Sequence, residues 1–219
     1  MIVGFVPATP LLSPEVSVTD VGVAAVQAAA RAVVADLVAA AGEVVVIGEA
    51  PERHDYAGTW DWSGFGVRRR GGAGHGLPRA LAVGAWLLDD AGWTGPRRFV
   101  GVPAATSPAE CAAVGEGLLA RSLLVVADGT ARRSLKAPGH LDERAEPFDR
   151  AVAAALGTAD RAVLSELDPT LAAQLLATGR AAWQVAAAAC ARPGWEAELL
   201  FSQAPYGVAW FVAGWTSSD

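Results

Sequence analysis

Four short runs of apolar, largely β-branched residues, spaced along the chain between longer alanine-rich segments, most constrain the fold. They are residues 2–6 (IVGFV), 44–47 (VVVI), 99–102 (FVGV) and 123–127 (LLVVA). Runs of this length without polar alternation are typical of central parallel strands that are buried on both faces. The segments between them carry helical patterns, at residues 21–41, 77–91 and 107–120. This alternation predicts an α/β fold with a mostly parallel central sheet flanked by helices on both faces.

The second half of the chain carries clear helix and turn signals. SPAE at residues 107–110 combines a capping serine, a proline in the first helical position and a glutamate that reaches back to the cap. DP at residues 168–169 starts another helix within a region expected to be helical as far as about residue 192. The end of the chain predicts a strand pair, residues 198–201 and 208–212, joined by a turn. No linker interrupts residues 1–219, so we expect a single domain.

Charge and hydropathy exclude several classes of function. The net charge of −6 and the pI of about 5.1 leave no basic surface for a nucleic acid. Residues 21–41 are apolar, but charged and polar residues punctuate them, which favours a buried helix and no membrane association. The first residues have no basic segment, and Cys111 and Cys190 lie in helical patterns. A cytoplasmic protein with free thiols is therefore expected.

Short motifs stand where the predicted strands end, which is the edge at which α/β proteins gather their sites. In chain order they are PATPLLSPE at residues 7–15, VVIGEAP at 45–51, GHGLP at 74–78, VVADGTA at 125–131, GR at 179–180 and APYGV at 204–208. Together they resemble the class III extradiol ring-cleavage dioxygenases, the LigB-like group of the Memo/LigB-like superfamily. The resemblance implies the LigB-like α/β fold with its C-terminal strand pair. It also implies an enzyme that holds Fe(II) with two histidines and a carboxylate and opens a catecholic ring with O₂.

The chain departs from that pattern at the residues that would hold the metal. The resemblance places the first metal histidine at Ala8, the second near Glu49 or Ala50, the third ligand near Thr178 and a catalytic histidine at Ala131. An alanine methyl group offers no lone pair to a metal ion. We therefore expect no metal site and no cofactor, although the family would use Fe(II).

Three residues remain as candidates for chemistry at the same edge. His75 is the histidine that the resemblance retains, and Asp128 and Glu49 stand at the ends of buried strands, where burial raises a carboxyl pKa. One interpretation is an acid–base set of these three side chains. The other is structural, with Asp128 accepting backbone hydrogen bonds in the turn after its strand.

The irregular segment of residues 48–76 supplies candidates for ligand binding. His54, Trp60 and Trp62 lie in it, and Tyr206 lies in the C-terminal turn. Loops of this length inside a compact domain are usually functional or mobile. The aromatic rings are expected to pack against a ligand, a partner subunit or the core, and the sequence leaves these alternatives open.

Three functions follow, ranked in this order. The first is a LigB-like homologue without Fe(II)-dependent ring cleavage, which keeps a cleft for a partner or for a small aromatic or acidic ligand. The second is an enzyme with altered chemistry built on His75, Glu49 and Asp128. The third is an extradiol dioxygenase in which two of the three histidines, His54, His75 and His140, meet a carboxylate at one point and hold the metal. A C-terminal apolar tail, residues 210–215, is expected to be exposed and is compatible with a homodimer.

Overall fold

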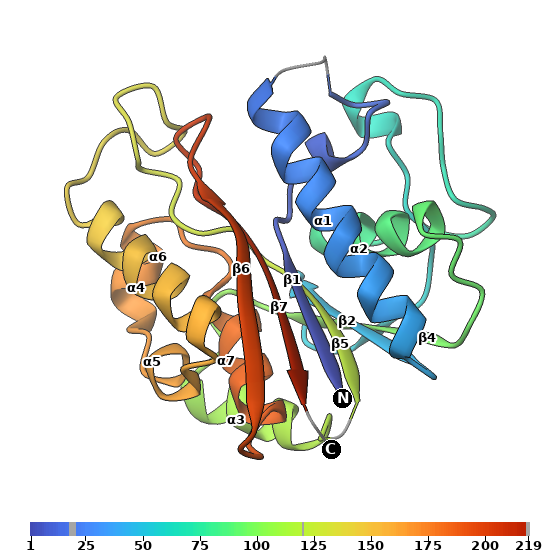
Figure 1. Cartoon of the computed structure of the whole chain (residues 1–219). Helices are drawn as coiled ribbons and strands as arrows, with labels where there is room; N and C mark the ends of the chain where they lie inside the picture. The colour runs from blue at the N-terminus through green and yellow to red at the C-terminus, as the bar shows by residue number, and fades with distance from the viewer. Residues whose placement is uncertain (18–20, 120, 218–219) are drawn as a thin grey trace.

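The computed structural model describes residues 1–17, 21–119 and 121–217, and within them the chain forms an α/β fold (Figure 1). Its seven described strands make one sheet in the order β3-β4-β2-β5-β1-β7-β6. The strands are β1 (Ile2–Val6), β2 (Val44–Glu49), β3 (Asp55–Tyr56), β4 (Arg97–Val102), β5 (Ser122–Val126), β6 (Trp195–Gln203) and β7 (Trp210–Ser217). The four predicted apolar runs form the centre of this sheet, together with β7.

The sheet is mixed rather than mostly parallel, which corrects the expectation from the sequence. Strands β1, β5, β2 and β4 pair in parallel, whereas β3, β7 and β6 pair antiparallel to their neighbours. The reason lies in the connections, because residues 204–209 between β6 and β7 are too few for the crossover that a parallel pair requires. The predicted strand pair is therefore a hairpin, and it extends the sheet beside β1.

Helices cover both faces of the sheet, as the sequence predicts (Figure 1). On one face lie α1 (Val21–Ala40) and α2 (Arg79–Asp90), which pack over β1, β2 and β5. The other face carries α3 (Pro108–Glu116), α4 (Ala145–Thr158), α5 (Arg161–Ser165), α6 (Pro169–Gln174) and α7 (Arg180–Ala189). Two short 3₁₀ helices, Pro10–Leu12 and Ser63–Phe65, lie in the loops. Each face has its own apolar core.

Helix α1 is long and apolar enough, by length and composition alone, to cross a membrane. In this fold it packs against β1 and β7 through a buried stripe. The stripe contains Val26, Ala30, Val33 and Leu37, which follow the three- and four-residue spacing of one helix face. The helix is therefore part of the core of the domain. The cytoplasmic location stays a prediction.

The helix starts predicted at Ser107 and Asp168 are confirmed, whereas the helix predicted from residue 77 begins at Arg79. The hydroxyl of Ser107 accepts the backbone N–H of Glu110 at 3.3 Å, and the Glu110 carboxylate accepts the N–H of Ser107 at 3.1 Å. The side chain of Asp168 likewise caps α6 by accepting the backbone N–H groups of Thr170 and Leu171. The long helical region divides into four helices, partly because Ala159 and Leu176 turn the chain with left-handed φ angles of 51° and 56°.

The expected exposed tail is wrong. Trp210, Phe211, Val212 and Trp215 are all buried. They belong to β7, which lies between β1 and β6, so its side chains enter the cores on both faces of the sheet. The apolar tail therefore no longer argues for a homodimer, and the homodimer stays a prediction without that support.

Candidate functional site

The carboxyl ends of β1, β2, β4 and β5 meet at one edge of the sheet, which we call the carboxyl edge. Asp128 lies there, two residues after β5, with 7% of its surface exposed. Its Oδ1 accepts the backbone N–H of Ala8 at 2.9 Å, and its carbonyl oxygen accepts the N–H of Gly179 at 2.9 Å. Asp128 therefore joins three segments that are far apart in the sequence, those that follow β1 and β5 and the one that starts α7.

The electrostatics of Asp128 depend on two neighbouring charged side chains. Burial raises the pKa of the Asp128 carboxyl from 3.8 to about 6, while Arg79 and the N–H of Ala8 oppose that rise and the negative charge of Glu49 adds to it. Burial also raises the pKa of Glu49, and Arg79 again opposes the rise. The carboxyl edge therefore holds two carboxyl groups with raised pKa values beside one arginine. Sequence reasoning missed Arg79, the first residue of α2, although it directly follows the GHGLP motif.

A second buried carboxylate, Asp149 of α4, lies close to this edge and has a structural role. It accepts the N–H of Thr130 at 2.9 Å and the Thr130 hydroxyl at 2.6 Å, and Arg133 forms an ion pair with it at 3.2 Å. Burial raises the pKa of Asp149, and these three donors oppose the rise. The carboxylate holds the segment after β5 in place. No motif in the sequence pointed to it.

His75 lies in the loop before α2 and its side chain is exposed. Its backbone carbonyl accepts the N–H of Thr59 at 3.0 Å, which fixes the path of the loop. Among the described contacts, no hydrogen bond or ion pair joins the His75 imidazole to Asp128 or Glu49. The charge of Glu49 raises the pKa of Asp128, whereas no described interaction links either carboxyl group to the imidazole of His75.

The residues at the expected metal positions do not provide a ligand set for Fe(II). Ala8 and Ala50 are buried, with their methyl groups in the apolar core, and Ala131 is half-buried with its N–H bonded to the carbonyl of Leu175. Within the described ranges, no three His, Cys, Asp or Glu side chains lie close enough together to hold a metal ion. The two carboxyl groups present have an arginine beside them, and a cation there weakens the attraction for a metal ion.

Thr178, at the expected third ligand position, lines a hollow of about 630 Å³ on the α7 side of the carboxyl edge. The loop after β4 provides one wall and α6 with the following residues provides the other. Its lining consists mainly of alanine and other small residues: Ala104, Ala105, Pro169, Thr170, Ala172, Ala173, Gln174, Leu176, Ala177, Thr178 and Arg180. A volume of this size is within the range that small-molecule sites occupy.

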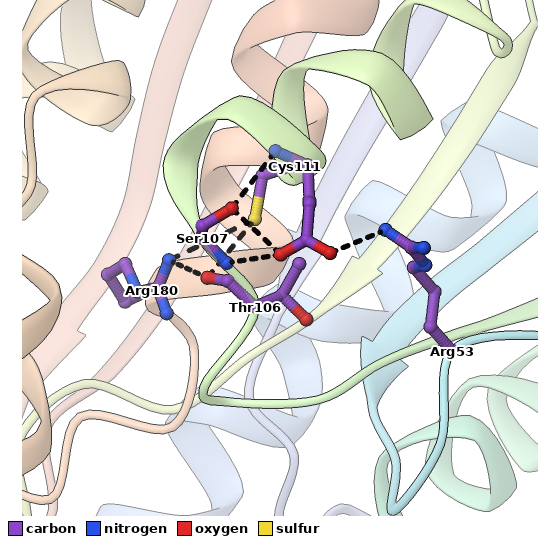
Figure 2. A network of polar contacts seen from close by, with 6 residues as sticks. Arg53, Thr106, Ser107, Cys111 and Arg180 are labelled. Carbon is purple, nitrogen blue, oxygen red and sulfur yellow. Dashed lines mark hydrogen bonds and ion pairs between the residues drawn. The ribbon is translucent and has the colours of Figure 1, made fainter.

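Arg180 is the charged residue in the lining of this hollow, and only 2% of its surface is exposed. Its Nη1 donates to the carbonyl of Thr106 and to Oε1 of Gln184, both at 2.7 Å, and its Nη2 donates to the carbonyl of Ala104. Figure 2 shows the Nη1 contacts with Thr106 and Cys111, and another guanidinium nitrogen pointing away from them. Sequence reasoning noted the GR pair but did not assign a role to this arginine.

The aromatic candidates of the long loop lie in the core or on the surface. Trp60 and Trp62 are buried against each other, with ring centroids 5.5 Å apart, and the indole of Trp60 donates to Asp89 at 2.8 Å. Of the three alternatives left open by the sequence, packing against the core describes both. His54 is exposed and stacks on Tyr56.

Tyr206 occupies the turn between β6 and β7. Its side chain is 45% exposed, and its ring meets that of Trp210 edge-on at 5.7 Å. The ring of Trp210 is buried, whereas that of Tyr206 is not. This candidate therefore lies against the sheet with one face open to solvent.

Comparison with known proteins adds no family. No family model matches the chain. No curated protein matches it either. At the carboxyl edge, burial raises the pKa values of Asp128 and Glu49, and Arg79 opposes both rises. The hollow lined by Arg180 lies at the same edge.

Proposed function

We propose that this protein is a LigB-like homologue that has lost Fe(II)-dependent ring cleavage and keeps a ligand-binding cleft at the carboxyl edge of its sheet. One observation carries the proposal. The residue at the position of the first metal histidine, Ala8, has its methyl group in the core and its N–H bonded to Asp128. In this arrangement the family's metal ligand is replaced by a backbone-to-carboxylate hydrogen bond.

Two further features support it. The motifs that resemble the family follow β1, β2 and β5 in the expected order, and Thr178 lines a hollow at the same edge. Ring cleavage by this family needs an iron atom with open coordination positions for the catechol and for O₂. Ala8, which has no metal-binding atom in its side chain, and two carboxyl groups whose pKa values Arg79 lowers do not provide such a site.

The test combines iron binding with oxygen uptake. The purified protein would be loaded with Fe(II) under anaerobic conditions, desalted, assayed for iron, and then mixed with catecholic substrates in an oxygen electrode. We expect the iron content to be well below one atom per chain. We expect the oxygen uptake to equal that of the same amount of Fe(II) without protein. Stoichiometric iron with a ring-opened product would overturn the proposal. Glu49→Gln is the control, because iron held at the carboxyl edge would be lost in this variant and adventitious iron would not.

A second candidate function is acid–base catalysis at the same edge. The raised pKa of Asp128, about 6, places the carboxyl close to the pH at which it both accepts and donates a proton. Glu49 raises and Arg79 lowers the pKa of Asp128, so these two side chains tune the pH at which the carboxyl would exchange a proton. The assay is a screen of ester hydrolysis and enolisation reactions between about pH 5 and about pH 8. Activity with an apparent pKa near 6 that Asp128→Asn abolishes would support this function, and activity that survives the substitution would exclude Asp128.

A further inference from the structure

The guanidinium of Arg180 is buried, and none of the described carboxylates forms an ion pair with it. Among the described ion pairs none includes this arginine, although its side chain is almost fully enclosed. A guanidinium has five N–H donors, and the described bonds use both hydrogens of Nη1 and one of Nη2. The Nε–H and one Nη2–H have no acceptor among the described hydrogen bonds. A nearly enclosed cation without a charged partner is costly unless an anion balances it.

The thiol of Cys111, which contacts the guanidinium, does not supply that anion. Cys111 lies with its Sγ 3.9 Å from Nη1 of Arg180. Burial raises the pKa of the Cys111 thiol, and the positive charge of Arg180 only partly opposes this rise. The sulfur therefore stays neutral near pH 7. The carboxylate of Glu110 is engaged in the helix cap and in an ion pair with Arg53 at 3.3 Å.

The hollow beside Arg180 has the composition of a site for a small acid. Of its described lining residues, Arg180 alone is charged, and most of the others are alanine, leucine or proline. Thr170, Gln174 and Thr178 are polar and neutral. One cation balances one negative charge, so this lining suits a monocarboxylate better than a doubly charged phosphate. The apolar walls suit an uncharged hydrocarbon body attached to the carboxylate.

We propose that the hollow binds a small organic monocarboxylate, with the carboxylate group bound by Arg180 and the apolar body packed against the alanine-rich walls. This inference deepens the proposed function, because it assigns a ligand class to the cleft. The ligand replaces the missing counter-ion of the guanidinium. A charge-assisted pair of this kind in a buried place is stronger than one in water.

The test compares acids with their neutral amides by isothermal titration calorimetry at constant ionic strength. Benzoate and butyrate are the probes, benzamide and butyramide are the matched neutral compounds, and inorganic phosphate is a separate arm. We expect both acids to bind at least about tenfold more tightly than their amides. Equal affinity of acid and amide would overturn the proposal, and binding of phosphate without either acid would overturn the monocarboxylate assignment.

A pair of variants at Ala105 locates the site without disturbing the bonds of Arg180. Ala105 is exposed on the rim of the hollow, next to the residue whose carbonyl accepts from Nη2. In Ala105→Glu the new carboxylate competes for Arg180, and we expect acid binding to weaken by at least about tenfold. In Ala105→Gln, which has nearly the same shape without the charge, we expect a change of less than about threefold. Equal affinities in the two variants would place the bound acid elsewhere and defeat the proposal.

The outcome is independent of the iron test described above. Acid binding through Arg180 together with iron-dependent ring cleavage would defeat the proposed function and leave this site standing. Absence of both acid binding and ring cleavage would defeat this site and leave the loss of iron chemistry standing.

Discussion

Replacing Asp128 with asparagine should change how the stability of the protein depends on pH. The asparagine Oδ1 can still accept the N–H of Ala8, so the bond between the segments after β1 and β5 is kept. The ionisable group is lost. The comparison between the two proteins therefore isolates the cost of holding a charge at this buried position.

The expected size of the effect follows from the pKa. In the native protein the pKa of Asp128 is about 6, against an ordinary value of 3.8. Between these values the native state binds this proton and the unfolded chain does not, so stability falls as the pH rises through this window and is level above it. One pKa unit corresponds to about 1.4 kcal/mol, so the full loss is about 3 kcal/mol, of which about 2–3 kcal/mol falls between about pH 4 and about pH 8.

The assay is urea unfolding of both proteins at steps across that pH range. We expect the free energy of unfolding of Asp128→Asn minus that of the wild type to increase by about 2–3 kcal/mol from the acidic to the neutral end. Groups that do not interact with Asp128 titrate alike in both proteins and cancel in the difference, and Glu49, which raises the pKa of Asp128, is the described carboxyl group that does not. A difference that is constant with pH would mean that Asp128 has an ordinary pKa in the native state, and the account of the carboxyl edge would be wrong.

Three further predictions test the neighbouring contacts. Arg79→Met should raise the pKa of Asp128 above about 6, because the arginine opposes the rise caused by burial; carboxyl ¹³C NMR titration measures this, and an unchanged pKa would contradict it. Thr130→Val should lower the free energy of unfolding, measured in urea, by about 1–3 kcal/mol, because the buried carboxylate of Asp149 loses the hydroxyl donor at 2.6 Å. A loss below about 0.5 kcal/mol would show that this hydrogen bond contributes little. Ser107→Ala should cost about 1 kcal/mol by removing the cap of α3, with Ser107→Thr as the control that keeps the capping oxygen and retains most of the stability.

Local signals predicted those parts of the fold that depend on a few neighbouring residues. Residues 2–6 form β1 with the predicted bounds, and the capping residues of α3 and α6 form the predicted bonds. The predicted strand at residues 44–47 extends to Glu49 in the sheet, because pairing with β4 continues to the residue beyond the apolar run. The short strand β3 was not predicted, since two residues carry too little pattern to distinguish a strand from a loop.

The candidate site was predicted in part. Asp128 and Glu49 were identified from their places at strand ends, and both have raised pKa values beside Arg79. Arg79 itself was missed, because its nearness to the two carboxyl groups arises only when α2 packs over β2 and β5. The contacts of the buried aromatic pair, Trp60 and Trp62, were left undecided between a ligand, a partner subunit and the core for the same reason.

The sequence by itself determined the alternation of strands and helices, the capped starts of α3 and α6, and the alanine at position 8, where the family resemblance expects a histidine. Only the tertiary structure decided the mixed sheet order, the burial of β7, and the hollow beside Arg180. The physical reason is range: propensity and capping act within one or two turns of chain, whereas burial and charge depend on which distant segments meet.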